Sequence, residues 1–352
     1  MTTTERIQFI DLAKGVCILL VVMGHLVPAF NENLTFVYCF RMPLYFCLSG
    51  LFYKDYGGLM NLTVKKTNKI LIPFLAWYLI SYAVYYLGRV LTRSQIDAQY
   101  HLVDIFTTND IFNIPIWFLL CLFWSSILFT LIRRVAANEI QTGIGVLVAA
   151  GAGWLMSACG VFNFLYVGSA LSCMPFFYMG YMLKKSAILY PRADMLKTVM
   201  VMAGCLLGAS LLAFLPAEPP RLLYYKNGVS AGNVFEIYAC AAMFVVGILL
   251  LCKLVGRIPF VSWLGRYSII VLVTHMPLSA ITGTVINKAV GRFVTDDVKY
   301  LLNFTVVTVL MLLIIPFCRK CLPYITAQKD LITGSAQSAL RRFTGCRAAD
   351  TK

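Results

Sequence analysis

Long apolar stretches separated by short polar segments dominate the pattern of this chain. Each stretch is close to the roughly 20 residues that a helix needs to cross the hydrocarbon core of a bilayer. Ten of them can be counted, at residues 15–30, 34–53, 70–91, 116–132, 143–162, 165–183, 198–215, 234–252, 268–286 and 300–318. The fifth and sixth are separated by only a few residues and could be divided differently. The pattern predicts an all-α integral membrane protein with about ten transmembrane helices.

Composition and charge support this prediction and add an orientation. Hydrophobic residues make up 60% of the chain and charged residues 13%, which lies outside the range of ordinary soluble domains. Lys and Arg outnumber Asp and Glu by 30 to 15, but they lie in short segments between the apolar stretches. We therefore expect no nucleic-acid partner. Most of these basic residues fall on the side of the amino terminus, so the positive-inside rule predicts that both termini are cytoplasmic.

The domain organisation that follows is simple. We expect one membrane domain over residues 1–322 and a short basic cytoplasmic tail over residues 323–352. The first apolar run lacks a convincing cleavage site, so it is expected to stay in the mature protein. The 12 cysteines are scattered mainly through the apolar stretches, as is typical of small buried hydrophobic residues. Cys318 and Cys321 form one isolated C-x-x-C pair, and we expect no metal site.

The first apolar segment carries ionisable side chains on one helix face. His25 follows Lys14 by eleven residues, and Asp11 lies three residues before Lys14. At about 100° per residue these positions share a stripe, and Lys14 and His25 are about 16 Å apart along the axis. An ionisable residue inside a hydrophobic span is costly and by default indicates a functional site. An imidazole there could act as a base near neutral pH.

Arg41 and Pro43 interrupt the second apolar stretch. If the first two spans form a tight antiparallel hairpin, His25 and Arg41 should lie at one level, in the outer half of the membrane. Pro43 predicts a kink in the second span, a feature tolerated where it lines a cavity. The alternative is that Arg41 reaches out to the lipid headgroups and Pro43 only bends the helix.

Further candidates lie in later spans. His275 sits inside the ninth stretch, where packing in the core and lining a site are both open. Glu236 lies near the outer end of the eighth stretch and could orient His25 or pair with Arg41, or simply be exposed. Lys65, Lys66 and Lys69 precede the third stretch. This cluster could set the topology of the chain or bind the phosphates of an anionic donor.

Several motifs resemble the membrane acyltransferase family 3, and more narrowly its fucose 4-O-acetylase-like branch. The family's basic residue, ten intervening residues and histidine match Lys14 and His25, with lysine replacing the commoner arginine. The sequence RMPLYFCLSG at residues 41–50 resembles the family's HMPLFFFLSG, with Arg41 in place of histidine. Other matching segments are the basic pair Lys66 and Lys69 before L-x-P, IWFLLCLF at 116–123, PFFYMGYMLKK at 175–185 and LGRYSIIVLVTHMPL at 264–278.

The resemblance implies an O-acyltransferase that moves an acyl group, usually acetyl from cytoplasmic acetyl-CoA, to a hydroxyl of a carbohydrate or a lipid-linked sugar. It implies a multi-pass protein of the bacterial inner membrane that modifies a cell-envelope glycan. Acetyl-CoA would be the acyl donor. The loss of histidine at position 41 puts any scheme with two imidazoles in doubt.

The resemblance and the residue pattern together give a set of expected site residues. We expect His25 to be catalytic, assisted by Asp11 and Glu236, with Lys14, Lys66 and Lys69 binding the CoA phosphates and Arg41, Trp117 and His275 contacting the acceptor. A rival interpretation is a secondary transporter or flippase for an anionic lipid or sugar. A membrane protein without catalytic activity is a third.

Overall fold

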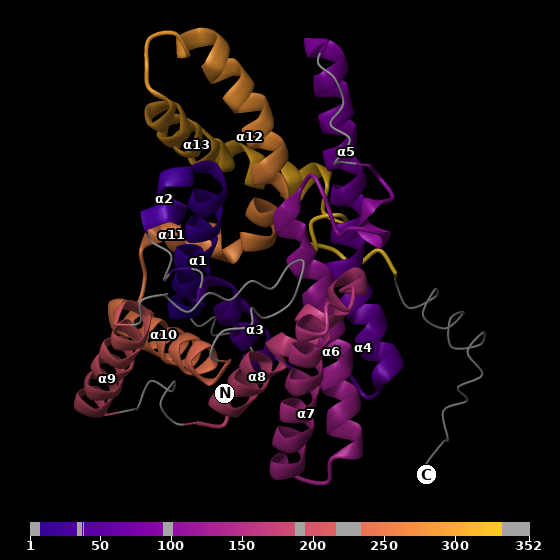
Figure 1. The fold of residues 1–352 in the computed structure, drawn as a ribbon, viewed down its shortest axis with the longest axis vertical. Coiled ribbons are helices and arrows are strands. Elements are labelled where there is room, and N and C mark those ends of the chain that lie inside the picture. The colour runs from indigo at the N-terminus through magenta and orange to yellow at the C-terminus, as the bar shows by residue number, and fades with distance from the viewer. Residues whose placement is uncertain are drawn as a thin grey trace.

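The computed structural model describes residues 8–33, 37, 39–93, 101–186, 194–215 and 234–332. Within these ranges the chain is helical and contains no strand. The helices are α1 (Gln8–Leu26), α2 (Pro28–Asn33), α3 (Arg41–Leu51), α4 (Leu59–Lys66), α5 (Ile72–Thr92), α6 (Trp117–Val135), α7 (Glu139–Ala158), α8 (Val167–Leu183), α9 (Met195–Phe214), α10 (Val234–Val255), α11 (Pro259–Arg266), α12 (Ser268–Val290) and α13 (Asp296–Cys321) (Figure 1).

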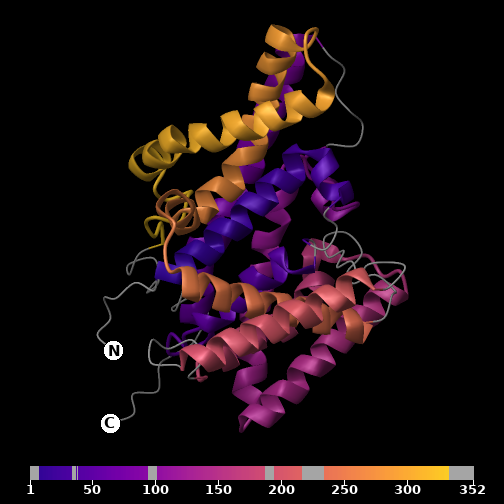
Figure 2. The ribbon, with the colours of Figure 1, turned by 90° about the vertical axis from the view of Figure 1, so that its left-hand side faces the viewer.

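Helix α1 is the central element of the fold. It packs against α11, α10, α12 and α3 (Figures 1 and 2). Its apolar side chains are buried along its whole length, from Ile10 to Leu26. By contrast, α9 is largely exposed, because it packs mainly against α10. The helix with the ionisable stripe is therefore largely enclosed by other helices.

Glycines set the closest contact of α1. A Cβ atom added to Gly15 would lie 1.9 Å from the backbone oxygen of Val261 on α11. One added to Gly265 would lie 1.9 Å from the backbone oxygen of Asp11. Small residues are favoured at such membrane-helix contacts because they let two backbones approach closely. The pair Gly15 and Gly265 thus fixes α11 against the first half of α1.

Eight described helices or helical runs are long and apolar enough to cross a membrane, against the ten stretches expected. The expected stretches at 34–53 and 165–183 are the two that have no counterpart among these eight. Helix α8 is 17 residues long, and α3 is only 11 residues long, or about 16 Å, which is too short for a core of about 30 Å. The all-helical membrane architecture is confirmed, and the second stretch is not a continuous span.

Pro43 explains why the second stretch is broken. We expected it to kink a continuous span, and this expectation was wrong. Helix α3 begins at Arg41, and its first turn is closed by the bond from the Leu44 N–H to the Phe40 oxygen. Pro43 therefore lies in the first turn, where a missing N–H costs nothing. The proline nitrogen cannot donate to the Cys39 oxygen, so this position is well suited to the first turn of a helix.

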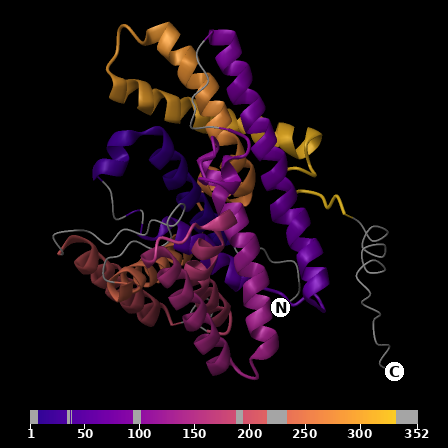
Figure 3. The same cartoon turned by 45° about the vertical axis from the view of Figure 1, so that its right-hand side comes forward.

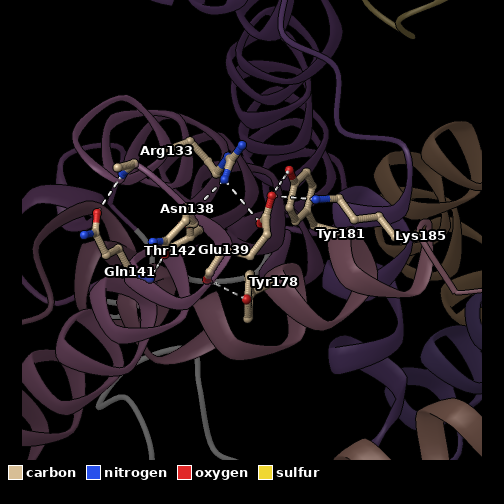
Figure 4. A network of polar contacts seen from close by, with 9 residues as sticks. Arg133, Asn138, Glu139, Gln141, Thr142, Tyr178, Tyr181 and Lys185 are labelled. Carbon is tan, nitrogen blue, oxygen red and sulfur yellow. Dashed lines mark hydrogen bonds and ion pairs between the residues drawn. The ribbon is translucent and has the colours of Figure 1, made fainter.

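A polar network joins the ends of α6, α7 and α8. The Glu139 carboxylate, in the first turn of α7, pairs with Arg133 of α6 and with Lys185 just after α8. It also accepts a hydrogen bond from the Tyr181 hydroxyl, and Asn138 caps α7 (Figure 4). Because these groups satisfy one another, the network accounts for the corner of the bundle without invoking a ligand.

Candidate active site

The two intramembrane histidines lie against each other. His25 is in the last turn of α1, and His275 is in the middle of α12. Their ring centroids are 5.7 Å apart, with the ring planes at 40°. His275 is completely buried, and His25 is half-buried. The structure thus supplies the second imidazole that the substitution at position 41 appeared to remove.

The hydrogen bonds of His275 set which of its nitrogens is available. Its Nδ1 lies 2.9 Å from the backbone oxygen of Val271, one turn earlier in α12. Because a carbonyl oxygen only accepts, this contact requires the proton on Nδ1. The buried Nε2 has no hydrogen-bond partner in the described part of the chain. His275 therefore presents a bare acceptor nitrogen, which a hydroxyl group can satisfy.

Next to His275, Pro277 opens the hydrogen-bond ladder of α12. A proline has no N–H, so the oxygen of Val273 loses its usual partner four residues on. Asn113, just before α6, replaces it: its Nδ2 donates to Val273 O at 2.9 Å and to Ser81 Oγ at 2.9 Å. Asn113 is 1% exposed. This bond holds the connection between α5 and α6 against the helix that carries His275.

Arg41 approaches the histidine pair from α3. Its side chain is buried, and Nη1 lies 3.5 Å from the backbone oxygen of Leu20. The Cys17 thiol donates to the backbone oxygen of Arg41 at 2.7 Å. The backbone of Arg41 is therefore beside Cys17, about two turns of α1 from His25, so the expected shared level is wrong. The guanidinium itself lies beside Leu20, between one and two turns of α1 before His25.

The opposite end of the stripe on α1 holds Asp11 and Lys14. Both are half-buried. The Lys14 ammonium lies 5.2 Å from the centre of the Phe52 ring, just after α3. The Tyr45 hydroxyl donates to the backbone oxygen of Lys14 at 3.0 Å, which ties α3 to α1 at this level. The stripe therefore runs along the α1–α3 contact from Lys14 towards the histidines.

Lys66 and Lys69, two of the three lysines expected to bind the donor, differ in their partners. Lys66, at the end of α4, is half-buried and has no acidic partner among the described residues. Lys69 lies on a π-helical turn, η2 (Thr67–Leu71), and pairs with Asp330. Lys65 pairs with the same carboxylate. Turns of this kind occur frequently at functional sites.

Glu236 and Trp117 lie on the flanks of this arrangement. Glu236 is half-buried in the first turn of α10. The same helix packs against α3, and its Phe244 ring lies 5.4 Å from the ring of Phe40, the residue before Arg41. Trp117 begins α6 and is buried against Tyr166 and Phe118.

A comparison with protein families identifies the family of the chain. The family model described as an acyltransferase domain, Acyl_transf_3, matches residues 7–319. The chain belongs to the acyltransferase-3 family. No curated protein and no solved structure gives a significant match. The matched region of this acyltransferase includes both histidines, Arg41 and the lysines at positions 65, 66 and 69.

Some groups at this site were missed from the sequence. The need for a donor such as Asn113 could have been anticipated from Pro277, because a proline inside a buried helix leaves a carbonyl oxygen without its usual N–H partner. The sequence does not say which residue supplies that donor. Asp330 gave no signal, since it lies in a basic tail that is remote from Lys65 and Lys69 along the chain. Both contacts arise only when the helices pack.

Proposed function

We propose that this membrane acyltransferase is an O-acetyltransferase that uses acetyl-CoA and modifies a hydroxyl group of a carbohydrate in the cell envelope. The pair formed by His25 and the buried, unpartnered Nε2 of His275 carries the proposal. Imidazoles act as bases near neutral pH, and two of them inside an apolar bundle favour proton transfer to or from a hydroxyl. The family membership supports the acyl-transfer reaction.

In the proposed reaction His25 is the base. It takes the proton of the acceptor hydroxyl while that oxygen attacks the thioester carbonyl. The carbon–sulfur bond then breaks, and the CoA sulfur takes the proton as the thiol. His275 Nε2 accepts a hydrogen bond from a hydroxyl of the acceptor. The buried Arg41 guanidinium stabilises the negative charge that develops on the carbonyl oxygen, an effect that is strong where water is excluded.

The donor is proposed to enter from the Lys14 end of α1, the side expected to be cytoplasmic. Lys66 supports this because it is a half-buried cation without an acidic partner among the described residues. Lys14 lies about 16 Å from His25 along α1, so the donor's phosphates and its thioester would lie at opposite ends of the stripe. The pantetheine arm would follow the contact between α1 and α3.

Purified protein in lipid nanodiscs tests the proposal. The release of CoA thiol from acetyl-CoA is measured with membrane extracts as acceptor, and acetylated envelope glycans are identified by mass spectrometry. We expect thiol release and glycan acetylation with the native protein and with His101→Gln, whose side chain is exposed and remote from the pair in sequence. His25→Ala should abolish both. Acetylation that persists in His25→Ala would overturn the proposal.

The same nanodiscs separate the proposal from a transporter. An O-acetyltransferase consumes acetyl-CoA and leaves a covalent ester on the acceptor. A transporter or flippase would move an anionic lipid or sugar between the two faces of a proteoliposome without releasing thiol. Movement of an unmodified sugar that is unaffected by acetyl-CoA would contradict the enzyme and favour the transporter.

A further inference from the structure

The chain turns back towards α4 and α5 after α13 ends. We call residues 322–332 the C-terminal strap; in Figure 3 it passes beside α5. The Trp77 indole N–H donates to the Ile325 oxygen at 3.1 Å. Asn68 bonds both the N–H and the oxygen of Ile332, at 2.8 and 3.1 Å. These are specific contacts at two points, so the strap is docked on α5 and on η2, next to the lysines at the end of α4.

Between those two points Asp330 reaches a pair of lysines. Its two carboxylate oxygens lie 2.8 Å from the ammonium groups of Lys65 and Lys69. Lys69 also donates to the backbone oxygen of Ala327 at 2.8 Å. The two ammonium groups hold the pKa of Asp330 below its ordinary value, so the carboxylate is charged at neutral pH. The two lysines are thus arranged around one anion with two oxygens.

The charges at this turn are not balanced by the strap. Lys65 and Lys69 bring two positive charges, and Asp330 returns one negative charge. Lys66 adds a third cation that has no acidic partner in the described part of the chain. A phosphate group carries up to two negative charges and three acceptor oxygens. It would therefore satisfy the two lysines more fully than a carboxylate does.

We propose that Lys65 and Lys69 form a phosphate-binding site that Asp330 occupies in the absence of ligand, so that phosphate groups displace the strap. The ligand's identity as the CoA donor rests on the proposed function, whereas the anion site itself rests on the contacts above. Lys65, which the sequence motifs do not include, becomes a ligand-binding residue. The strap then reduces access of the donor to its own site until the donor's phosphates replace the carboxylate.

Limited proteolysis of the native protein tests displacement without relying on catalysis. Lys329 is exposed, but trypsin needs a locally released segment to cut after it. We expect 3′,5′-ADP, the phosphorylated end of CoA, to accelerate cleavage after Lys329, and adenosine to have no effect. Asp330→Asn should be cut rapidly with or without 3′,5′-ADP. Asp296→Asn removes the acid of an exposed ion pair with Lys299 and should behave as the native protein.

Kinetics provide the second measurement. Asp330→Asn should lower the KM for acetyl-CoA several-fold and leave the KM for acetyl-pantetheine, which lacks the nucleotide phosphates, unchanged. Lys65→Gln should raise the KM for acetyl-CoA and leave the KM for acetyl-pantetheine unchanged. A purely structural strap would change both KM values together.

The possible outcomes distinguish the two proposals. Cleavage after Lys329 that is unaffected by saturating 3′,5′-ADP overturns the strap proposal. Faster cleavage with 3′,5′-ADP in a protein that transfers no acetyl group supports the anion site and overturns the proposed function.

Discussion

The imidazole of His25 on α1 lies against that of His275 on α12, with 5.7 Å between the ring centroids. The family motif places a histidine at position 41, where this chain has arginine. In three dimensions α12 provides an imidazole beside His25, while Arg41 contributes a buried positive charge. The arrangement therefore brings together two imidazoles and one cation, which suits the proposed reaction, in which a proton is removed and an oxyanion develops.

Replacing His275 should weaken catalysis without preventing folding. In His275→Gln the side chain still offers an amide N–H to Val271, but the free imidazole nitrogen is lost. We expect kcat to fall by about 10²-fold, at the lower end of the roughly 10²–10⁴ range for a lost acid–base group. We expect a larger fall in kcat for His25→Ala. The measurement is thiol release from acetyl-CoA in nanodiscs.

The matched control for this experiment is His101→Gln, the remaining histidine of the chain. The described bonds of His101 involve its backbone, so its replacement should leave the rate unchanged. Equal rates in native protein and His275→Gln would show that His275 is only a packing residue.

Asn113 and Pro277 should behave as a coupled pair. Asn113→Leu leaves the buried oxygen of Val273 without a donor and should destabilise the fold by about 1–3 kcal/mol. Pro277→Ala restores an N–H within α12 that can reach the same oxygen. In the Pro277→Ala background, Asn113→Leu should lower the free energy of unfolding by clearly less. A double-mutant cycle on detergent-solubilised protein measures the coupling, and strictly additive effects would contradict it.

The contact between α1 and α11 should not tolerate a methyl group. In Gly15→Ala the new Cβ would meet the Val261 oxygen, so the backbones must separate. We expect a loss of about 1–3 kcal/mol of stability. Gly88→Ala on α5 is the control, because no atom lies within 4 Å of its added Cβ. It should be neutral or stabilise by about 0.5–1 kcal/mol. Thermal unfolding of both variants checks the difference.

The docking of the strap should depend on pH in the acid range. Lys65 and Lys69 lower the pKa of Asp330 below its ordinary value of 3.8. A carboxyl with a lowered pKa contributes its stability above the unfolded value and loses it as the pH falls through the folded value. Each ion pair is partly exposed, so its contribution is about 0.2–1 kcal/mol. The melting temperatures of native protein and Asp330→Asn should therefore differ near neutral pH and converge below about pH 4.

The general architecture could be predicted because apolar length is a local property. Helices such as α6 and α13 follow from stretches of membrane length at 116–132 and 300–318. The prediction of a span at residues 34–53 was wrong because apolar composition does not distinguish a spanning helix from a short one. Pro43 carried the missing information: a proline marks the first turn of a helix as readily as a kink.

The site was only partly predictable for the same reason. His25 and His275 each stand out as ionisable residues in apolar stretches. Their contact, however, depends on how α1 and α12 pack, and nothing local encodes it. The prediction that Arg41 lies at the level of His25 was wrong because it assumed a tight hairpin, whereas α2 and α3 are separate short helices. Contacts between Asp330 and the lysines depend on the return of the chain after α13.

The bond from Asn113 to Val273 also limits how the specificity of this enzyme could be redesigned. The connection between α5 and α6 contains Asn113 and lies near the helix of His275, so it is an obvious segment to exchange when a different acceptor is wanted. A grafted loop without an equivalent amide would remove the donor on which α12 depends at Pro277. Loop exchange and catalytic integrity are therefore coupled here, and a transplanted loop must bring either an equivalent amide or a partner helix without the proline.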